Sequence, residues 1–255
     1  MPLLDETMNY LPPGNLKILQ KKKGYRFSID SILLAHFVRL GDAQKVVDLG
    51  TGSGVIPIIL ATKVESTEIW GVEIQEELAE MAKRNVVMNH LQSRVHIMKA
   101  DARSLADRMP SAEFDIVLTN PPYRKMRSGR ISLQREKAIA RHELEGSLDD
   151  MARIAFRLLK PKGSFYLVYP AVRIADLITC LRDNYLEPKR MRLVHPKMGK
   201  GAQLTLVEAS KRGGPGVEIQ PPLFVHGLNG RYSDEMRAIY SSITEASRSP
   251  DHEEK

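Results

Sequence analysis

VVDLGTGSGV, residues 46–55, is the stretch that decides the fold. Its two successive valines are typical of a strand that is covered on both faces, as in a parallel sheet. Glycines at positions 50, 52 and 54 let the backbone turn sharply and let a ligand approach without meeting a Cβ atom. A helical pattern begins at Val55. The stretch therefore predicts a strand, a turn that binds a nucleotide-like ligand, and a helix.

Short β-rich runs alternate with helical patterns from about Lys45 to Ser210. Strands are expected over Lys45–Gly50, Glu68–Ile74, Val95–Asp101, Phe114–Asn120, Gly163–Pro170, Arg190–His195 and Gln203–Ala209. Helices are expected over Val55–Lys63, Gln75–His90, Ser147–Leu159 and Ala171–Asn184. This alternation predicts a doubly wound α/β sheet of parallel strands. The last two strands are joined by only a short loop, so they should pair antiparallel.

Two flanks surround this central domain, which is assigned to residues 45–210. Residues 1–44 carry a basic run and then a helical pattern over Ile29–Arg39, ahead of what is expected to be the first strand. Residues 211–255 form a C-terminal extension with an amphipathic stretch, Ser233–Ile243, and a polar tail that is expected to be disordered.

Composition limits the classes of function. The chain has 255 residues and a formal net charge of +7, which favours a polyanionic partner such as RNA. Its single cysteine, Cys180, rules out an intramolecular disulfide and a cysteine-rich zinc site, so no metal is expected. There is neither a signal pattern nor an apolar run long enough for a membrane span, so we expect a cytoplasmic protein with no membrane partner. The oligomeric state is not indicated.

Three acidic residues end three successive expected strands, namely Asp48, Glu73 and Asp101. Ligands of doubly wound sheets bind at this carboxyl edge. A carboxylate at Asp48 suits a positive amino group and would repel the pyrophosphate of a dinucleotide. Glu73 can accept hydrogen bonds from both ribose hydroxyls, or it can be an acid at the start of the following helix. Asp101 can accept a hydrogen bond from an adenine amino group, or it can cap a short helix, Ala102–Asp107.

Asn120-Pro121-Pro122-Tyr123 ends the fourth expected strand. It resembles the N-P-P-Y motif of methyltransferases that act on amide or exocyclic amino nitrogens. Such a nitrogen is a poor nucleophile, so two fixed hydrogen-bond acceptors, the Asn120 side-chain oxygen and the Pro121 carbonyl, can favour charge build-up on it. The prolines stiffen the turn and Tyr123 can stack on an unstacked base. The alternative is an ordinary Pro-Pro turn with an exposed tyrosine.

The glycine turn with its preceding acid is similar to that of class I methyltransferases that bind S-adenosylmethionine. This resemblance implies a Rossmann-like, seven-stranded, mostly parallel sheet with an antiparallel C-terminal hairpin strand. From about Gly24 to Tyr240 the chain also resembles bacterial enzymes that methylate N6 of the adenine 3′ of the anticodon in a valine tRNA. The resemblance implies a cofactor pocket made by Arg26, Phe27, Asp30, Asp48, Gly50, Thr51, Gly52, Gly54, Glu73, Ile74, Asp101, Ala102 and Asn120.

Basic residues in two regions are candidates for contacts with RNA phosphates. The first region follows the catalytic motif and includes Arg124, Lys125, Arg127, Arg130 and Arg135. The second region contains Lys189, Arg190, Arg192, His195, Lys197 and Lys200, and Lys197 and Lys200 are selected from it. The alternative for each of the two regions is a basic surface that is solvated and does not contact RNA.

Two other functions stay open at this point. Glutamine amides present similar hydrogens, so a protein glutamine N5-methyltransferase acting on a release factor is one alternative. The 44 residues ahead of the first expected strand leave little room for the extra helical domain of that family. The other alternative is a non-catalytic RNA-binding protein, against which the intact Asn120–Tyr123 motif and the three acids argue.

Overall fold

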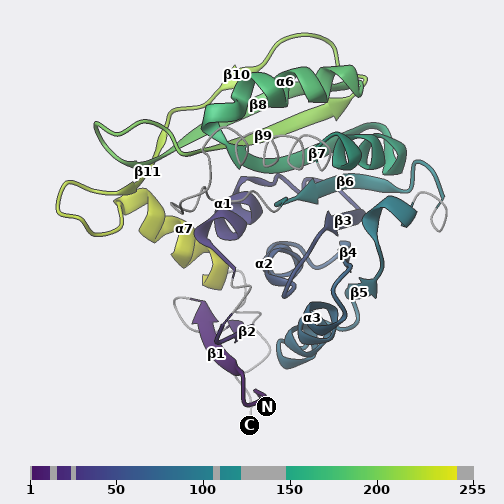
Figure 1. Cartoon of the computed structure of the whole chain (residues 1–255), viewed down its shortest axis with the longest axis vertical. Coiled ribbons are helices and arrows are strands. Elements are labelled where there is room, and N and C mark those ends of the chain that lie inside the picture. The colour runs from purple at the N-terminus through teal and green to yellow at the C-terminus, as the bar shows by residue number, and fades with distance from the viewer. Residues whose placement is uncertain (1, 12–15, 24–26, 106–109, 122–147, 246–255) are drawn as a thin grey trace, which may run out of the picture.

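The computed structural model describes residues 2–11, 16–23, 27–105, 110–121 and 148–245, and Figure 1 shows their arrangement. A central sheet has the strand order β10-β8-β9-β7-β6-β3-β4-β5, and β11 also pairs with β8. Its principal strands are β3 (Lys45–Leu49), β4 (Glu68–Glu73), β5 (Val95–Lys99), β6 (Phe114–Thr119), β7 (Leu159–Pro170), β8 (Leu186–Lys197) and β9 (Leu204–Lys211).

The predicted doubly wound α/β fold is confirmed. Strands β3 to β7 pair only in parallel with one another, and β9 lies antiparallel between β7 and β8. β3 is central, and Val46, Val47 and Leu49 are fully buried because neighbouring elements cover both faces of the strand.

Two short strands extend the sheet beyond the seven that were expected. β10 (Glu218–Ile219) and β11 (Leu223–His226) both run parallel to β8, one after the other along its free edge. Pro221-Pro222 separates them, and runs of two and four residues are too short to show an alternating pattern. The amphipathic stretch that follows is a helix, α7 (Asp234–Glu245), which packs near β11.

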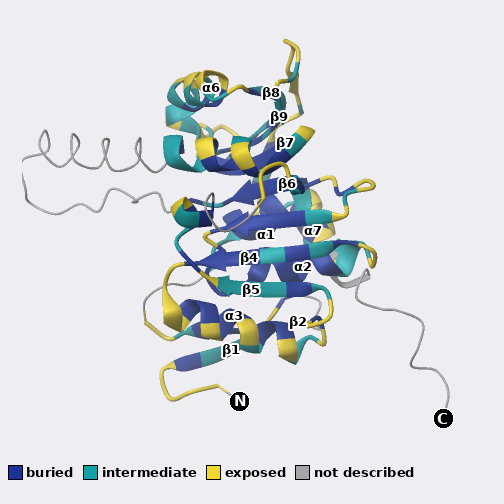
Figure 2. Cartoon of the chain, turned by 90° about the vertical axis from the view of Figure 1, so that its right-hand side faces the viewer, coloured by how far each residue is buried: buried dark blue, intermediate teal, exposed yellow. Residues whose placement is uncertain are grey.

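Helices cover both faces of the sheet (Figures 1 and 2). α1 (Ile29–Phe37), α2 (Val55–Lys63) and α7 share one apolar core, whereas the helix at 148–158 and α6 (Ile174–Asp183) share the other. α3 (Glu76–Met88) contacts β4 and β5. No helix in the described ranges is long and apolar enough to cross a membrane.

An antiparallel hairpin precedes β3, so the expectation that Lys45–Gly50 is the first strand is wrong. The hairpin consists of β1 (Glu6–Leu11) and β2 (Leu16–Lys21) and forms its own two-stranded sheet, which lies against α3 (Figure 2). The basic run in this part of the chain obscured the apolar side chains of Leu16, Ile18 and Leu19, which are buried. The local sequence pattern therefore indicated a charged segment at β2, which the tertiary structure shows to be a strand.

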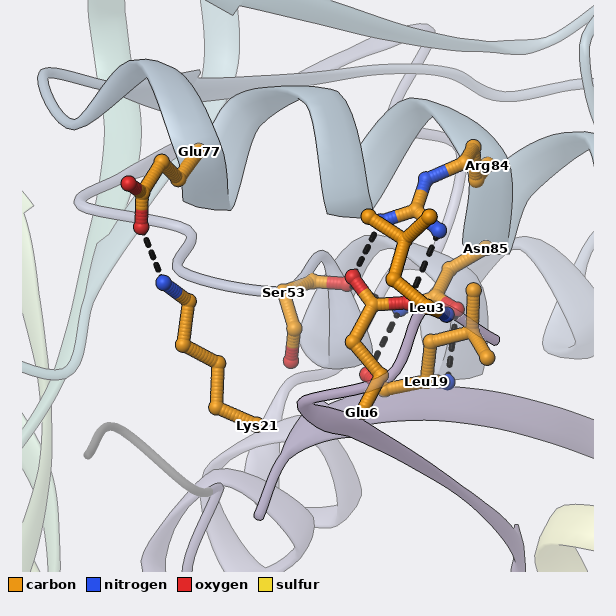
Figure 3. Close-up of polar contacts among 8 residues, drawn as sticks. All are labelled: Leu3, Glu6, Leu19, Lys21, Ser53, Glu77, Arg84 and Asn85. Atoms are coloured by element: carbon orange, nitrogen blue, oxygen red, sulfur yellow. Dashed lines mark hydrogen bonds and ion pairs between the residues drawn. The ribbon is translucent and has the colours of Figure 1, made fainter. Parts of the chain in front are cut away.

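Asn85 on α3 joins this hairpin to the glycine turn (Figure 3). Its Oδ1 accepts a hydrogen bond from the Leu19 amide at 2.7 Å, and its Nδ2 donates to the carbonyls of Leu19 at 3.2 Å and Ser53 at 2.9 Å. The side chain is fully buried, so water cannot replace these bonds. Two ion pairs, between Arg84 and Glu6 and between Lys21 and Glu77, also join α3 to the hairpin.

We expect Asn85→Ala to lower the free energy of unfolding by about 1–3 kcal/mol, because it leaves buried backbone groups without partners. Urea unfolding measures this change. Asn89→Ala is the matched control, since Asn89 makes the same pair of bonds to the backbone of Lys17 at an exposed position. Equal effects of the two substitutions would contradict a special role for the buried amide.

Candidate active site

The carboxyl edge of the sheet brings the predicted site together. β3 lies between β6 and β4, and Leu49 is opposite both Val72 and Thr119 in the register. Asp48 on β3, Glu73 at the end of β4 and Asn120 after β6 therefore lie at the ends of three adjacent strands, as expected.

The glycine turn adopts the backbone conformation for which glycine is suited. Gly50, Gly52 and Gly54 have φ values of 77°, 57° and 80°, which disfavour residues with a Cβ atom. A Cβ on Gly54 would also lie 3.1 Å from the Cβ of Ala82 on α3. The amides of Gly50 and Thr51 both donate to the Val72 carbonyl at 2.9 Å, so the turn is fixed to the neighbouring strand.

Asp48 is a fully buried acid beside this turn. Within the described residues neither of its carboxylate oxygens receives a hydrogen bond of normal geometry, and the buried hydroxyl of Ser53 has no partner there either. Burial is the main cause of a rise in the pKa of Asp48 to about 7; the Thr51 hydroxyl opposes this rise and the Glu73 carboxylate adds to it. A cationic ligand would stabilise the ionised carboxylate, whereas a pyrophosphate would not.

Glu73 is buried and supports the turn directly. Its Oε2 accepts a hydrogen bond from the Gly52 amide at 2.8 Å and its Oε1 accepts one from the Gln75 amide at 2.9 Å. The second bond is the helix-start role considered as an alternative, because Gln75 precedes the first residue of α3. The carboxylate oxygens each have further lone pairs, so these bonds leave acceptor capacity for ribose hydroxyls.

Asp101 adopts the capping role that was its alternative assignment. It is the N-cap of η1 (Ala102–Ser104) and accepts a hydrogen bond from the Arg103 amide at 2.9 Å. Its carboxylate also forms an ion pair with the Arg103 guanidinium at 2.6 Å, which lowers the pKa of Asp101. Arg103 is largely exposed, so an adenine amino group would compete with a solvated partner for this acid.

Asn120 has one end of its amide fixed by a residue that the sequence did not single out. Its Nδ2 donates to the Ser31 hydroxyl of α1 at 3.0 Å. Ser31 is buried at the start of α1, and this bond determines which way the amide faces. No residue of the described ranges donates a hydrogen bond to the Oδ1 atom, so this atom can accept one from a substrate. No sequence pattern pairs the two residues, because 89 positions separate them.

The other predicted site residues differ in their surroundings. Phe27 is partly buried against the α1–α2 core, Asp30 is 8% exposed, and Ala102 and Pro121 are buried. Ile74 is 54% exposed beside Glu73. Predicted residues that lie outside the described ranges are Arg26, Pro122, Tyr123, Arg124, Lys125, Arg127, Arg130 and Arg135.

The second basic region separates into two groups. Arg190 is buried in an ion pair with Glu208 and lies over the Phe37 ring, Arg192 binds Glu235, and Lys189 donates to backbone carbonyls of the 214–216 turn. These three side chains stabilise the fold. Lys197 and Lys200, the two that were selected, are exposed at the β8–β9 loop.

The fold and the arrangement of this edge define a Rossmann-like class I methyltransferase. The chain belongs to the methyltransferase small domain family, whose family model matches residues 27–172. It is an enzyme of the methyltransferase class, in agreement with the sequence prediction.

Relatives and solved structures agree with this assignment. A tRNA1(Val) (adenine(37)-N6)-methyltransferase from Aeromonas salmonicida is 32% identical over 80% of this chain and 84% of its own length. One of the same name from Tolumonas auensis is 26% identical over 86% of this chain and 90% of its own. The crystal structure of a predicted O-methyltransferase from Agrobacterium tumefaciens has the same fold, with a TM-score of 0.68 at 21% identity over 84% of this chain and 96% of that one.

Asp48→Asn should stabilise the ligand-free protein at pH 8. The folded-state pKa of Asp48 lies above its ordinary value of 3.8, so the folded protein binds the proton more tightly and loses stability as pH rises from about 4 to about 7. Removing the buried charge should raise the free energy of unfolding at pH 8 by on the order of a few kcal/mol. The melting temperature of the variant should exceed that of wild type at pH 8, and the difference between the two melting temperatures should be smaller at pH 5. Asp42→Asn, at an exposed turn, is the control, and a pH-independent gap would contradict the assignment.

Proposed function

We propose that this chain transfers a methyl group from S-adenosylmethionine to the N6 amino group of an adenine in tRNA, near the anticodon. The observation that carries the proposal is the hydrogen bond from the Asn120 amide nitrogen to the Ser31 hydroxyl, which fixes this amide at the end of the strand next to that of the buried acid Asp48. The named activity of relatives that match most of the chain supports the same reaction and substrate.

The residues at the edge fit S-adenosylmethionine. Asp48 and Glu73 bring two buried acids to one turn, and a ligand that carries an ammonium group and a sulfonium would compensate them. In this assignment Asp48 faces the amino group of the cofactor, Glu73 accepts from its ribose, and Asp101 accepts from its adenine. When bound, the cofactor supplies an electrophilic methyl group.

Asn120 and Pro121 act on the nitrogen that receives the methyl group. The Asn120 Oδ1 accepts one hydrogen of the amino group and the Pro121 carbonyl accepts the other. The nitrogen would gain positive charge as it takes the methyl group and the carbon–sulfur bond of the cofactor breaks, and these two acceptors would stabilise that charge until the nitrogen releases a proton to water. Proline limits the backbone freedom of the turn, so the acceptors keep their direction. Tyr123 is assigned to stack on the target base, which has to leave its helix or loop stack.

The rival substrate is a glutamine amide in a release factor, which offers two similar hydrogens. Radiolabelled S-adenosylmethionine distinguishes the two, with total tRNA in one reaction and a release factor in the other. Label in tRNA, located by digestion to N6-methyladenosine, is the expected result. Label in the release factor alone would overturn the substrate, and label in neither would overturn the reaction.

Asn120→Ala should lower the rate of methyl transfer to tRNA by about 100- to 1000-fold, because it removes an acceptor that works in the transition state. Affinity for S-adenosylmethionine, measured by calorimetry, should stay within about twofold of wild type. Asn9→Ala in the N-terminal hairpin serves as the control. If cofactor affinity fell as far as the rate, Asn120 would belong to the cofactor pocket alone.

Ser31→Ala should lower kcat about fivefold to tenfold, since it removes one hydrogen bond that orients the Asn120 amide. The KM for tRNA and the affinity for the cofactor should not change. Ser28→Ala is a matched control at the same helix start, where the Ser28 side chain makes no capping hydrogen bond. An unchanged kcat in Ser31→Ala, or an equal loss in both variants, would argue against this positioning role.

A further inference from the structure

A cavity lies beyond the catalytic strand, in a part of the molecule that the proposed reaction does not use. It has a volume of about 580 Å³ and is lined by Pro196, Lys197, Lys200, Gln203 and His226, among others. These residues come from the end of β8, from the β8–β9 loop and from the end of β11, which pairs with β8. The cavity is widely open to solvent, so it can admit part of a larger ligand.

The cavity lies at the same edge of the sheet as Asn120. Since β9 runs antiparallel to both β7 and β8, β8 has the same direction as β7, and β11 runs parallel to β8. The last residues of β6, β8 and β11 therefore lie at one edge (Figure 1). The Gln203 carbonyl accepts a hydrogen bond from the Ala171 amide at 2.9 Å, which connects the cavity wall to the end of β7.

Hydrogen bonds and ring contacts hold the walls of this cavity. The Nδ1 atom of His195 lies 2.7 Å from the Lys200 carbonyl, and that of His226 lies 3.1 Å from the Pro196 carbonyl. A carbonyl can only accept, so both Nδ1 atoms carry hydrogen. The His226 ring also stacks on Tyr232, which stacks on Tyr240 of α7. The site is consequently formed before any ligand arrives.

The lining has the chemistry that recognises a nucleotide. Lys197 and Lys200 are exposed cations, and no acidic residue is present among the described side chains that line the cavity. A phosphate group would pair with these lysines. Gln203 offers an amide for base edges, and the imidazole of His226 offers an aromatic surface, with Tyr232 40% exposed behind it. Single-stranded RNA is recognised by this combination of cations and stacking rings.

We propose that this cavity binds a nucleotide of the tRNA substrate at a fixed distance from the adenine that reacts at Asn120. The inference rests on the proposed function and names a second contact for the same substrate. Two to four strand spacings of about 4.8 Å separate β6 from the cavity walls, or about 10–20 Å. At a rise of about 3.4 Å, this distance corresponds to roughly three to six stacked nucleotides. The bound nucleotide lies within the same loop or the adjoining stem.

The test compares two double variants of the full chain. Lys197→Gln with Lys200→Gln removes both cations of the cavity, and Lys17→Gln with Lys162→Gln removes two exposed cations away from this edge. Affinity for fluorescently labelled tRNA is measured across a range of salt concentrations. The cavity variant should bind more weakly, with a salt slope reduced by about 1 for each lysine that pairs with a phosphate. The control variant should keep the wild-type slope.

Crosslinking locates the nucleotide and separates the two proposals. Transcripts that carry 4-thiouridine, irradiated on wild-type protein, should label peptides within 196–203 or 223–231. Suppose that wild type transfers methyl groups to tRNA. If the cavity variant then kept the wild-type salt dependence of tRNA affinity, or if all crosslinks fell outside these two peptides, this inference would be overturned and the proposed function would stand. Crosslinks in these peptides without methyl transfer would overturn the proposed function and retain the nucleotide site. Saturable binding of free adenosine monophosphate here, with tRNA affinity unaffected by the substitutions, would also overturn the inference.

Discussion

The buried carboxylate of Asp48, which has no cationic partner among the described residues, is the constraint on which the rest of the site depends. Burial of an unpaired charge is unfavourable, so the surrounding structure has to be rigid enough to maintain it. β3 supplies this rigidity because it is central in the sheet, and the glycine turn is bonded to β4 on one side. On the other side Asn85 connects the turn to the N-terminal hairpin. Strands and a helix outside the site therefore stabilise the fold enough to offset the unfavourable free energy of burying this acid.

The proposed role of Asn120 depends on the orientation of its side-chain amide. Asn120 sits at the end of a strand and before a proline, and its amide nitrogen is bound to the first turn of α1. α1 thus has two roles, since it fills the core with Ile32, Leu33 and Leu34 and it also fixes the amide that faces the substrate. A helix that is so deeply buried moves little, which favours a fixed acceptor. The role proposed for Asn120 therefore depends on a residue of the N-terminal segment, Ser31.

The sequence was sufficient to predict the central fold because its periodic patterns are long and its glycine turn is distinctive. α2 begins and ends at the expected residues, Val55 and Lys63, and the strand ends that carry Asp48, Glu73 and Asn120 were correctly placed. Contacts between distant residues were not predictable. The hairpin depends on side-chain amides of α3 that pair with its backbone, and Ser31 gains its role only when α1 meets β6. Asp101 shows the opposite case, since its capping bond depends on neighbouring residues alone and was one of the two roles that the sequence indicated.

The two short strands of the C-terminal extension have a consequence for the outer side of β8. β8 is a twelve-residue strand, and without a neighbour its outer side would present unpaired amides and carbonyls to any other chain. β10 and β11 cover part of that side, and the two prolines between them cannot donate hydrogen bonds. The C-terminal extension thus replaces one long strand edge by two short ones, in addition to building one wall of the cavity.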